Sequence, residues 1–333
     1  MPPNYANQIH ALNDDDLERL VDVWQTRKTA DYVGTERFAG AGDMGRDVVG
    51  YVTSHRLDGP WHNFQCKQLK TQLTKPAVLR ELAKIIFHSC CGHFPLPERY
   101  NFVAPRGVNR KAKELISQPS KLATAMIDEW DENCAGHLVQ NETHVLTDKL
   151  HAVISAFDFT SVDAIDSRKL VADAAMKPVL VEWFGADPGP APSGQVPDSV
   201  AAEEFGYFDQ LAKAYSARSG MFYPDRQSAL DCKKHGKQFK VQRTRFFEAA
   251  YFKRYYRDNT PRGVVEAFET EVYHGVVDTH QGAHADALAK VDAVMSQAAV
   301  IQVSGVLGTY ARVPVKQGTC HHLANDGILP WTE

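Results

Sequence analysis

The sequence predicts an α/β N-terminal domain, with a central mixed sheet flanked by helices, followed by a mostly α-helical C-terminal domain. Two observations support this fold class. The first is the order helix, hairpin, helix, strand, helix in the first 130 residues, and the second is the long helical pattern at 239–258 and at 283–299. A chain of 333 residues with 44% hydrophobic residues can fill two cores. We expect the domains to span residues 1–150 and 151–333.

The N-terminal elements follow from the spacing of apolar residues. Leu17, Leu20 and Trp24 recur at helical intervals behind an acidic start, which predicts a helix at 15–27. The segments DVVGYV and HNFQCK are typical of two strands, with a turn at Asp58-Gly59 between them. A helix at 75–88, a buried strand at 100–104 and a helical stretch at 111–130 complete the predicted α/β sandwich.

The second half contains two segments that need interpretation. A Pro/Gly-rich stretch at 185–197 predicts an exposed loop. The predicted helix at 239–258 mixes arginines and lysines with aromatic residues. Phe247, Tyr251 and Tyr255 lie four residues apart, which favours a core-facing aromatic stripe beside a solvated basic face. A face that contacts DNA or a partner protein is the alternative.

Composition restricts the class of protein. The formal net charge of −4 provides no global basic field, so any contact with nucleic acid has to come from local lysines and arginines. Six scattered cysteines indicate free thiols and no disulfide. The sequence lacks an apolar run of eighteen residues and a signal-peptide pattern, so we expect a cytoplasmic protein with no membrane partner.

The hairpin carries the residues with the clearest chemical potential. The midpoint between Asp47 and Lys67 falls in the predicted turn, so we expect their side chains to lie nearly opposite each other. Strand alternation places Asn63, Gln65 and Lys67 on one face and turns Phe64 and Cys66 towards the core. Asp47, the side-chain carbonyl of Gln65 and the backbone carbonyl of Cys66 could bind Mg²⁺ or Mn²⁺, with Lys67 beside a phosphate. The simpler alternative is a half-exposed hairpin with solvated polar residues.

The strings GDMGRDVVGY and NFQCKQLK resemble the D…(D/E/Q)xK signature of the PD-(D/E)xK nuclease superfamily, and most closely its Mrr-like branch with Gln at the second acidic position. The resemblance covers residues 14–110. It implies a restriction-endonuclease-like fold and a Mg²⁺-dependent deoxyribonuclease with Asp47, Gln65 and Lys67 as catalytic residues. It also implies that Glu18 on the first helix completes the metal site, with Glu36 as the other nearby carboxylate. Two departures are Arg46 in place of Pro and the missing charge at Gln65.

The strings FYPDRQSA, FFEAAYFKRYYRDN and GTCHHLANDGILPW resemble the C-terminal modules of bacterial ABC-three-component and Lamassu defence systems. This second resemblance implies an antiphage effector that cuts double-stranded DNA. Its partners would be an SMC-like ATPase and a small third subunit, with possible homo-oligomerisation on activation. A nuclease-fold scaffold that binds DNA without cutting remains the alternative.

Three further clusters have simpler explanations or compete with the nuclease interpretation. A zinc module is one alternative, since two pairs have the spacing of zinc ligands, namely Cys90 with His93 and Cys134 with His137. The glycine-rich segment GTERFAGAGDMG lacks the GKS or GKT of a P-loop. For the C-terminal residues His321, His322 and Asp326 we favour a structural role, in a terminus anchored by Ile328, Leu329 and Trp331.

Overall fold

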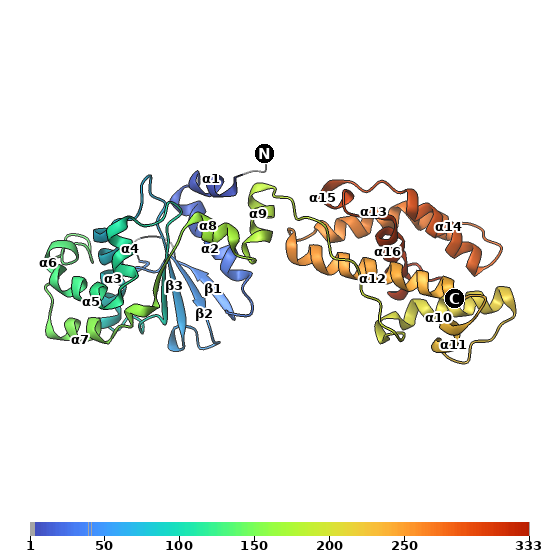
Figure 1. Ribbon diagram of the computed structural model, residues 1–333, viewed down its shortest axis with the longest axis horizontal. Helices are drawn as coiled ribbons and strands as arrows, with labels where there is room; N and C mark the ends of the chain where they lie inside the picture. The colour runs from blue at the N-terminus through green and yellow to red at the C-terminus, as the bar shows by residue number, and fades with distance from the viewer. Residues whose placement is uncertain (1–3, 39, 41, 333) are drawn as a thin grey trace. The chain divides into compact units, whose positions relative to one another are not determined.

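The computed structural model describes residues 4–38, 40 and 42–332, which form two compact units that divide between Ala186 and Asp187 (Figure 1). This division lies later than the expected boundary at 150/151. The difference arises because the segment from 151 to 186 completes the first unit, where it adds a fifth strand and two helices that cover one face of the sheet. Each unit has its own hydrophobic core.

The first unit contains a five-stranded sheet. Its strands are β1 Gly34–Arg37, β2 Val48–Tyr51, β3 Trp61–Cys66, β4 Arg99–Val103 and β5 Val162–Ile165. Its α-helices are α1 Tyr5–His10, α2 Asp14–Thr26, α3 Lys75–Cys90, α4 Arg110–Ile116, α5 Pro119–Asp128, α6 Trp130–Asn133, α7 Asp148–Ala156, α8 Ser167–Ala172 and α9 Met176–Phe184. Two 3₁₀ turns, η1 Arg56–Asp58 and η2 Phe159–Ser161, complete it.

The sheet is mixed, as predicted, and its strands lie in sequence order from β1 to β5. The strands β1, β2 and β3 are antiparallel neighbours, whereas β3, β4 and β5 are parallel. The hairpin and β4 were expected, but β1 and β5 were not. Both missed strands are only four residues long, and their burial is incomplete, so their sequences lack a strong apolar pattern.

Helices cover both faces of the sheet, which makes the first unit a three-layer structure (Figure 1). Trp61 and Phe102 pack with α3 on one face, and Phe64 packs with α2 and α9 on the other. The rings of Phe64 and Trp24 meet edge to face at 6.0 Å between centroids. The strand β3 is therefore buried on both sides, which contradicts the alternative of a half-exposed hairpin.

The hairpin between β2 and β3 differs from the prediction in its turn and its register. The connection spans residues 52–60 and contains η1, so it is longer than a turn at Asp58-Gly59 alone. Val48 pairs with Phe64, and one step further along this register Asp47 lies across from Gln65. The expected position of Asp47 opposite Lys67 is wrong, because the connection is centred on residue 56 and not on 57, which moves the partner of Asp47 by two residues on the second strand.

The second unit is entirely helical, and this confirms the predicted fold class. Its helices are α10 Phe205–Ser219, α11 Arg226–Asp231, α12 Gly236–Asn259, α13 Val264–Gln281, α14 Ala287–Val300, α15 Gly305–Gly308 and α16 Val313–Asn325, preceded by the 3₁₀ turn η3 Ala202–Glu204. The helix α16 is buried on almost every side, from Val315 to His321 without interruption. It lies along α12 and also contacts α10, α13 and α14.

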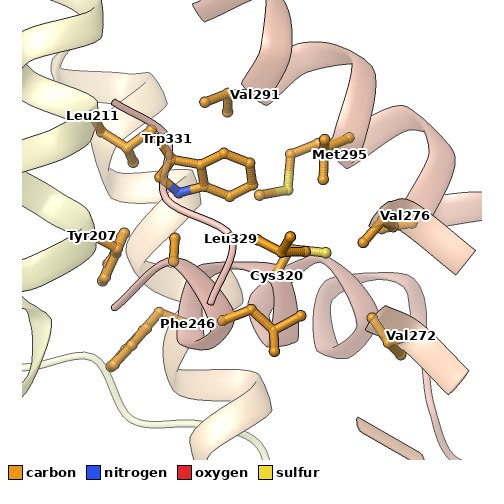
Figure 2. Packing of buried hydrophobic residues seen from close by; sticks show 14 of the residues in the cluster. Tyr207, Leu211, Phe246, Val272, Val276, Val291, Met295, Cys320, Leu329 and Trp331 are labelled. Atoms are coloured by element: carbon orange, nitrogen blue, oxygen red, sulfur yellow. The ribbon is translucent and has the colours of Figure 1, made fainter. Parts of the chain in front are cut away.

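The C-terminal segment closes the core of this unit. Trp331 is fully buried, and Figure 2 shows its indole ring beside Leu211, Val291 and Met295. Leu329 is buried nearby, whereas Ile328 is 54% exposed. The predicted anchoring of the terminus is thus confirmed for Leu329 and Trp331 but is wrong for Ile328.

The Pro/Gly-rich segment after α9 is a loop with mostly exposed residues, as predicted, but it is anchored to α12 at several points. The Tyr255 hydroxyl donates to the Pro188 carbonyl at 2.7 Å, and the Tyr256 hydroxyl donates to the Gly189 carbonyl at 2.7 Å. Gly194 lies so close to the backbone of Phe247 that an added Cβ would stand 2.5 Å away. These contacts fix the segment because its glycines allow a close approach.

The aromatic residues of α12 are more widely buried than the predicted stripe. Phe247 is buried as expected, but Tyr251 and Tyr255 are only partly buried, while Phe246 and Tyr256 lie in the core. The helix contacts neighbours on several sides, so one stripe does not describe its buried surface.

Among the described residues, no helix combines the length and hydropathy needed to cross a bilayer.

Gly318→Ala is expected to destabilise the second unit by roughly 1–3 kcal/mol, the usual cost of overpacking a core. An added Cβ at this position of α16 would lie 1.9 Å from the backbone oxygen of Arg245 on α12, so the two helices have to separate. Chemical denaturation measures the loss. Gly282→Ala is the matched control, since its nearest atom is at 3.4 Å. Equal stability of the two variants would contradict the close approach.

Candidate active site

The antiparallel pairing of β2 and β3 brings the beginning of one strand to the end of the other. Asp47 directly precedes β2, and Lys67 directly follows β3, so both lie at the same edge of the sheet. The preceding turn positions Asp47 through Gly45, which has a φ of +88°. The buried amide of Asn63 donates to the Gly45 carbonyl at 3.1 Å and ties this turn to β3.

The carboxylate of Asp47 is only 5% exposed and accepts two hydrogen bonds at one oxygen. The Gln65 amide nitrogen and the Cys66 backbone nitrogen each donate to Oδ2 at 2.7 Å. Among the described residues, no hydrogen bond reaches the other oxygen, Oδ1. The protein thus holds the carboxyl group firmly from one side and leaves its second oxygen free for another group.

Burial raises the pKa of Asp47 to about 7. The positive charge of Lys67 and the Cys66 hydrogen bond lower this pKa, but they do not outweigh the loss of solvation. The carboxylates of Glu18 and Asp43 raise it further. A negative charge at Asp47 is therefore costly at neutral pH unless additional positive charge comes close to it.

Lys67 has a partner that sequence reasoning missed. Its ammonium group lies 2.9 Å from Oε1 of Glu81 on α3. Glu81 and Asp47 raise the pKa of Lys67 although burial opposes its charge, so the lysine stays protonated. Glu81 follows Val78 by three residues, and Val78 is buried under the sheet. A carboxylate at this helical position could have been noticed as facing the strand end.

The two candidate carboxylates for completing the site differ in their surroundings. Glu18 pairs with Arg37 at 3.3 Å, and its charge raises the pKa of Asp47. Glu36 accepts a hydrogen bond from the Tyr51 hydroxyl at 2.6 Å. The charge of Glu18 thus acts on Asp47, whereas Glu36 is bonded to Tyr51, and neither carboxylate is hydrogen-bonded to Asp47.

Gln65 and Cys66 are arranged differently from the expectation. The side-chain nitrogen of Gln65, rather than its carbonyl, points at Asp47, and its Oε1 accepts from the Tyr100 hydroxyl at 3.4 Å. Cys66 presents its backbone nitrogen to Asp47. Both residues here position the carboxylate, and their role as metal ligands stays a prediction. The two N–H groups point at Asp47 because a buried carboxylate needs hydrogen-bond donors in place of water.

The oxygen Oδ1 of Asp47 is of the type that Mg²⁺ prefers, and the charges of Glu18 and Asp43 act on the same carboxyl group. Within the described residues, no group of three or more His, Cys, Asp or Glu side chains is arranged to hold a metal ion. Any cation at Asp47 would therefore need further oxygen ligands from backbone, water or substrate.

The four-ligand zinc alternative is not supported by the structure. Cys90, His93, Cys134 and His137 all lie in the described part of the chain, and they form no metal-binding group. Cys134 is fully buried, and burial raises the pKa of its thiol to about 12. It is therefore a protonated core residue.

The C-terminal histidines have the structural role that we predicted. His321 is fully buried between Trp331 and Gln242, and His322 lies 3.0 Å from the Phe246 carbonyl. Burial lowers the pKa of His322 to about 4 and that of His321 well below its usual range. Both rings are neutral at physiological pH, and both serve the contact between α12 and α16.

Asp47→Asn is expected to remove a pH-dependent loss of stability. The pKa of Asp47 rises from 3.8 to about 7 on folding, so the folded state binds this proton more tightly than the unfolded chain. The proton on Asp47 therefore stabilises the folded state fully below about pH 4, and this stabilisation is lost as the pH rises through 7. Wild type should lose at most about 4 kcal/mol relative to the variant over this range.

Urea denaturation of both proteins at pH 4.5, 6 and 8 measures this difference. The asparagine variant should be more stable than wild type at pH 8, since it keeps an acceptor for Gln65 and Cys66 without the charge. Asp58→Asn, at an exposed position in the hairpin turn, is the control. Parallel stability profiles for wild type and the Asp47 variant would contradict the buried charge.

Comparison with known proteins assigns the second unit. Residues 204–331 match C-terminal domain 6 of the ABC-three component (ABC-3C) systems. No curated protein and no solved structure gives a significant match. The matched range begins at the end of η3 and includes α10 to α16, so it coincides with the helical unit. The chain therefore contains C-terminal domain 6 of the ABC-three-component systems and is a component of such an antiphage defence system.

Proposed function

We propose that the chain is a metal-dependent DNA endonuclease and the effector of its ABC-three-component system. The observation that supports this best is the meeting of a buried carboxylate, Asp47, and a protonated lysine, Lys67, at one edge of the sheet. Metal-dependent phosphodiester hydrolysis can use this combination, because a cation held by a carboxylate and a lysine together stabilise charge on the phosphate. The order helix, three strands, helix, strand from α2 to β4 agrees with the expected restriction-endonuclease-like fold.

Each residue then has a defined task. Oδ1 of Asp47 and the carboxylate of Glu18 would hold Mg²⁺ or Mn²⁺, which supplies a polarised water and charge neutralisation when bound. Gln65 and the Cys66 backbone nitrogen hold Asp47 in place. Lys67 donates to an oxygen of the scissile phosphate. Glu81 keeps the lysine charged and directed towards the strand end.

The second unit would connect the nuclease to its system. We propose that domain 6 binds an SMC-like ATPase and the small third subunit, and that double-stranded DNA is the substrate of the first unit. Support comes from the match over residues 204–331 and from the resemblance of two strings within residues 14–110 to a nuclease signature. Homo-oligomerisation on activation belongs to the same proposal.

A scaffold that binds DNA without cutting is the second candidate. The orientation of Gln65 favours the scaffold, because the Gln65 amide nitrogen donates to Asp47 and the Gln65 carbonyl accepts from Tyr100, so this carbonyl is not directed at a metal ion. The site also has one negative charge fewer than a pair of acidic ligands would provide. A scaffold and an active nuclease differ in turnover, which a cleavage assay measures directly.

Purified protein, together with the products of its neighbouring genes, should cut plasmid DNA in the presence of Mg²⁺ or Mn²⁺. We expect Asp47→Asn and Lys67→Ala each to reduce the cleavage rate by roughly a hundredfold or more, the usual effect of removing a charge-stabilising group. Gel analysis of initial rates provides the measurement.

Lys70→Ala is the matched control for Lys67, since Lys70 is exposed three residues later and should leave the rate within about twofold. The melting temperature of each variant separates loss of chemistry from loss of fold. If wild type binds DNA with all its partners and cuts none, the scaffold is the better description and Lys67 has no catalytic role.

A further inference from the structure

The second unit has a polar pocket of about 560 Å³ that plays no part in the proposed nuclease. It lies among α10, α12, α14 and α16. Its volume is within the range of small-molecule sites, roughly 300–1,000 Å³. The residues that matter for its chemistry are Lys237, Val241, Gln242, Arg245, Asp292 and Met295.

Arg245 lines this pocket with a partly buried guanidinium that has no acidic partner. Its Nη1 donates to Oε1 of Gln242 at 2.9 Å, and no described carboxylate lies within ion-pair distance. Two residues earlier on the same helix, Arg243 is buried and makes two hydrogen bonds with the Glu204 carboxylate, at 2.7 and 2.8 Å. The fold thus pairs Arg243 directly with a carboxylate, whereas Arg245 has no carboxylate in contact. Burial lowers the pKa of Arg245, and the more distant charge of Asp292 opposes this only in part.

A chain of buried hydrogen bonds fixes the orientation of Arg245. The indole nitrogen of Trp331 donates to Nδ1 of His321 at 3.2 Å. The other ring nitrogen of His321 therefore carries the proton and donates to Oε1 of Gln242 at 2.8 Å. Gln242 thus accepts from His321 and from Arg245 at the same oxygen. Such preorganisation is typical of binding sites and is unusual for a solvated surface arginine.

The charges around the pocket favour a dianion. Lys237 on the first turn of α12 adds a second positive charge, and it has no ion pair with any described residue. Asp292 is the one carboxylate among the lining residues, but its side chain is 66% exposed and lies 3.5 Å from Arg218. A phosphate monoester gains more from two cations than a single carboxylate does. The exposed side of Val241 and the side chain of Met295 offer apolar surface for the rest of a ligand.

We propose that this pocket binds the phosphate group of a small phosphorylated molecule, with Arg245 as the main anchor and Lys237 as the second cation. The guanidinium would donate two parallel hydrogen bonds to phosphate oxygens, while Gln242 keeps it in place. The proposal does not depend on the nuclease, since its residues all belong to the second unit. It gives this domain a ligand of its own, in addition to any protein partner.

Calorimetric titration of the full chain with adenosine 5′-monophosphate and with inorganic phosphate tests the proposal. We expect saturable binding of the phosphate monoester, little binding of adenosine, and weaker binding at high salt. Arg245→Gln should lower the affinity by roughly tenfold or more, because it removes a charge-assisted pair. Lys237→Gln should lower it less, and Lys240→Gln, on the exposed side of the same helix, should leave it unchanged.

A second measurement on wild type keeps the test valid if Arg245→Gln fails to fold. Phenylglyoxal modifies accessible arginines, so the phosphate monoester should protect Arg245 but not the exposed Arg254 in peptide mass spectra. The absence of binding in wild type, equal affinity in Arg245→Gln, or unprotected Arg245 would overturn the proposal. Binding of a glutamate-rich peptide in place of either phosphate probe would also overturn it and would identify an acidic protein segment as the ligand.

Discussion

The Asp47 carboxylate accepts hydrogen bonds from Gln65 and from the Cys66 backbone, and nearly all solvent is excluded around it. This arrangement requires the register of β2 on β3, the turn at Gly45, and a helix on each face of the sheet. It also explains why the charge of Asp47 is unstable at neutral pH, because burial outweighs the help from Lys67. At the candidate site, the buried charge of Asp47 lowers the stability of the fold, and a bound cation would offset this loss.

Much of the first unit could be predicted from local patterns. The amphipathic helix α2 and the apolar helix α3 have clear periodicity, and the alternation in HNFQCK places Asn63, Gln65 and Lys67 on one face. The register could not be predicted, because a turn with a 3₁₀ segment shifts the pairing in a way that residue spacing does not reveal. The predicted proximity of Asp47 and Lys67 does not depend on this register, since both residues lie at the same edge of the sheet in either case.

The Lys67–Glu81 pair and the burial of arginines on α12 depend on tertiary contacts, which the sequence pattern does not reveal. Glu81 is separated from Lys67 by a loop and a helical turn, and only the packing of α3 on the sheet brings the two together. In the second unit, the predicted solvated basic face of α12 holds for Lys253, Arg254 and Arg257, which are exposed. It does not hold for Arg243, which is buried with Glu204, or for Arg245, which is held by Gln242. Amphipathic periodicity fails there because α12 packs against several helices and against the segment after α9.

The most direct test of the central claim is a titration of the full chain with Mn²⁺, followed by electron paramagnetic resonance, in wild type and in Asp47→Asn. The account predicts one bound ion per chain in wild type at pH 8, weaker binding as the pH falls below about 7 where Asp47 takes up a proton, and loss of the site in the variant. Equal Mn²⁺ binding by both proteins, or affinity that does not change with pH, would contradict the assignment of Asp47 as the residue that holds the metal.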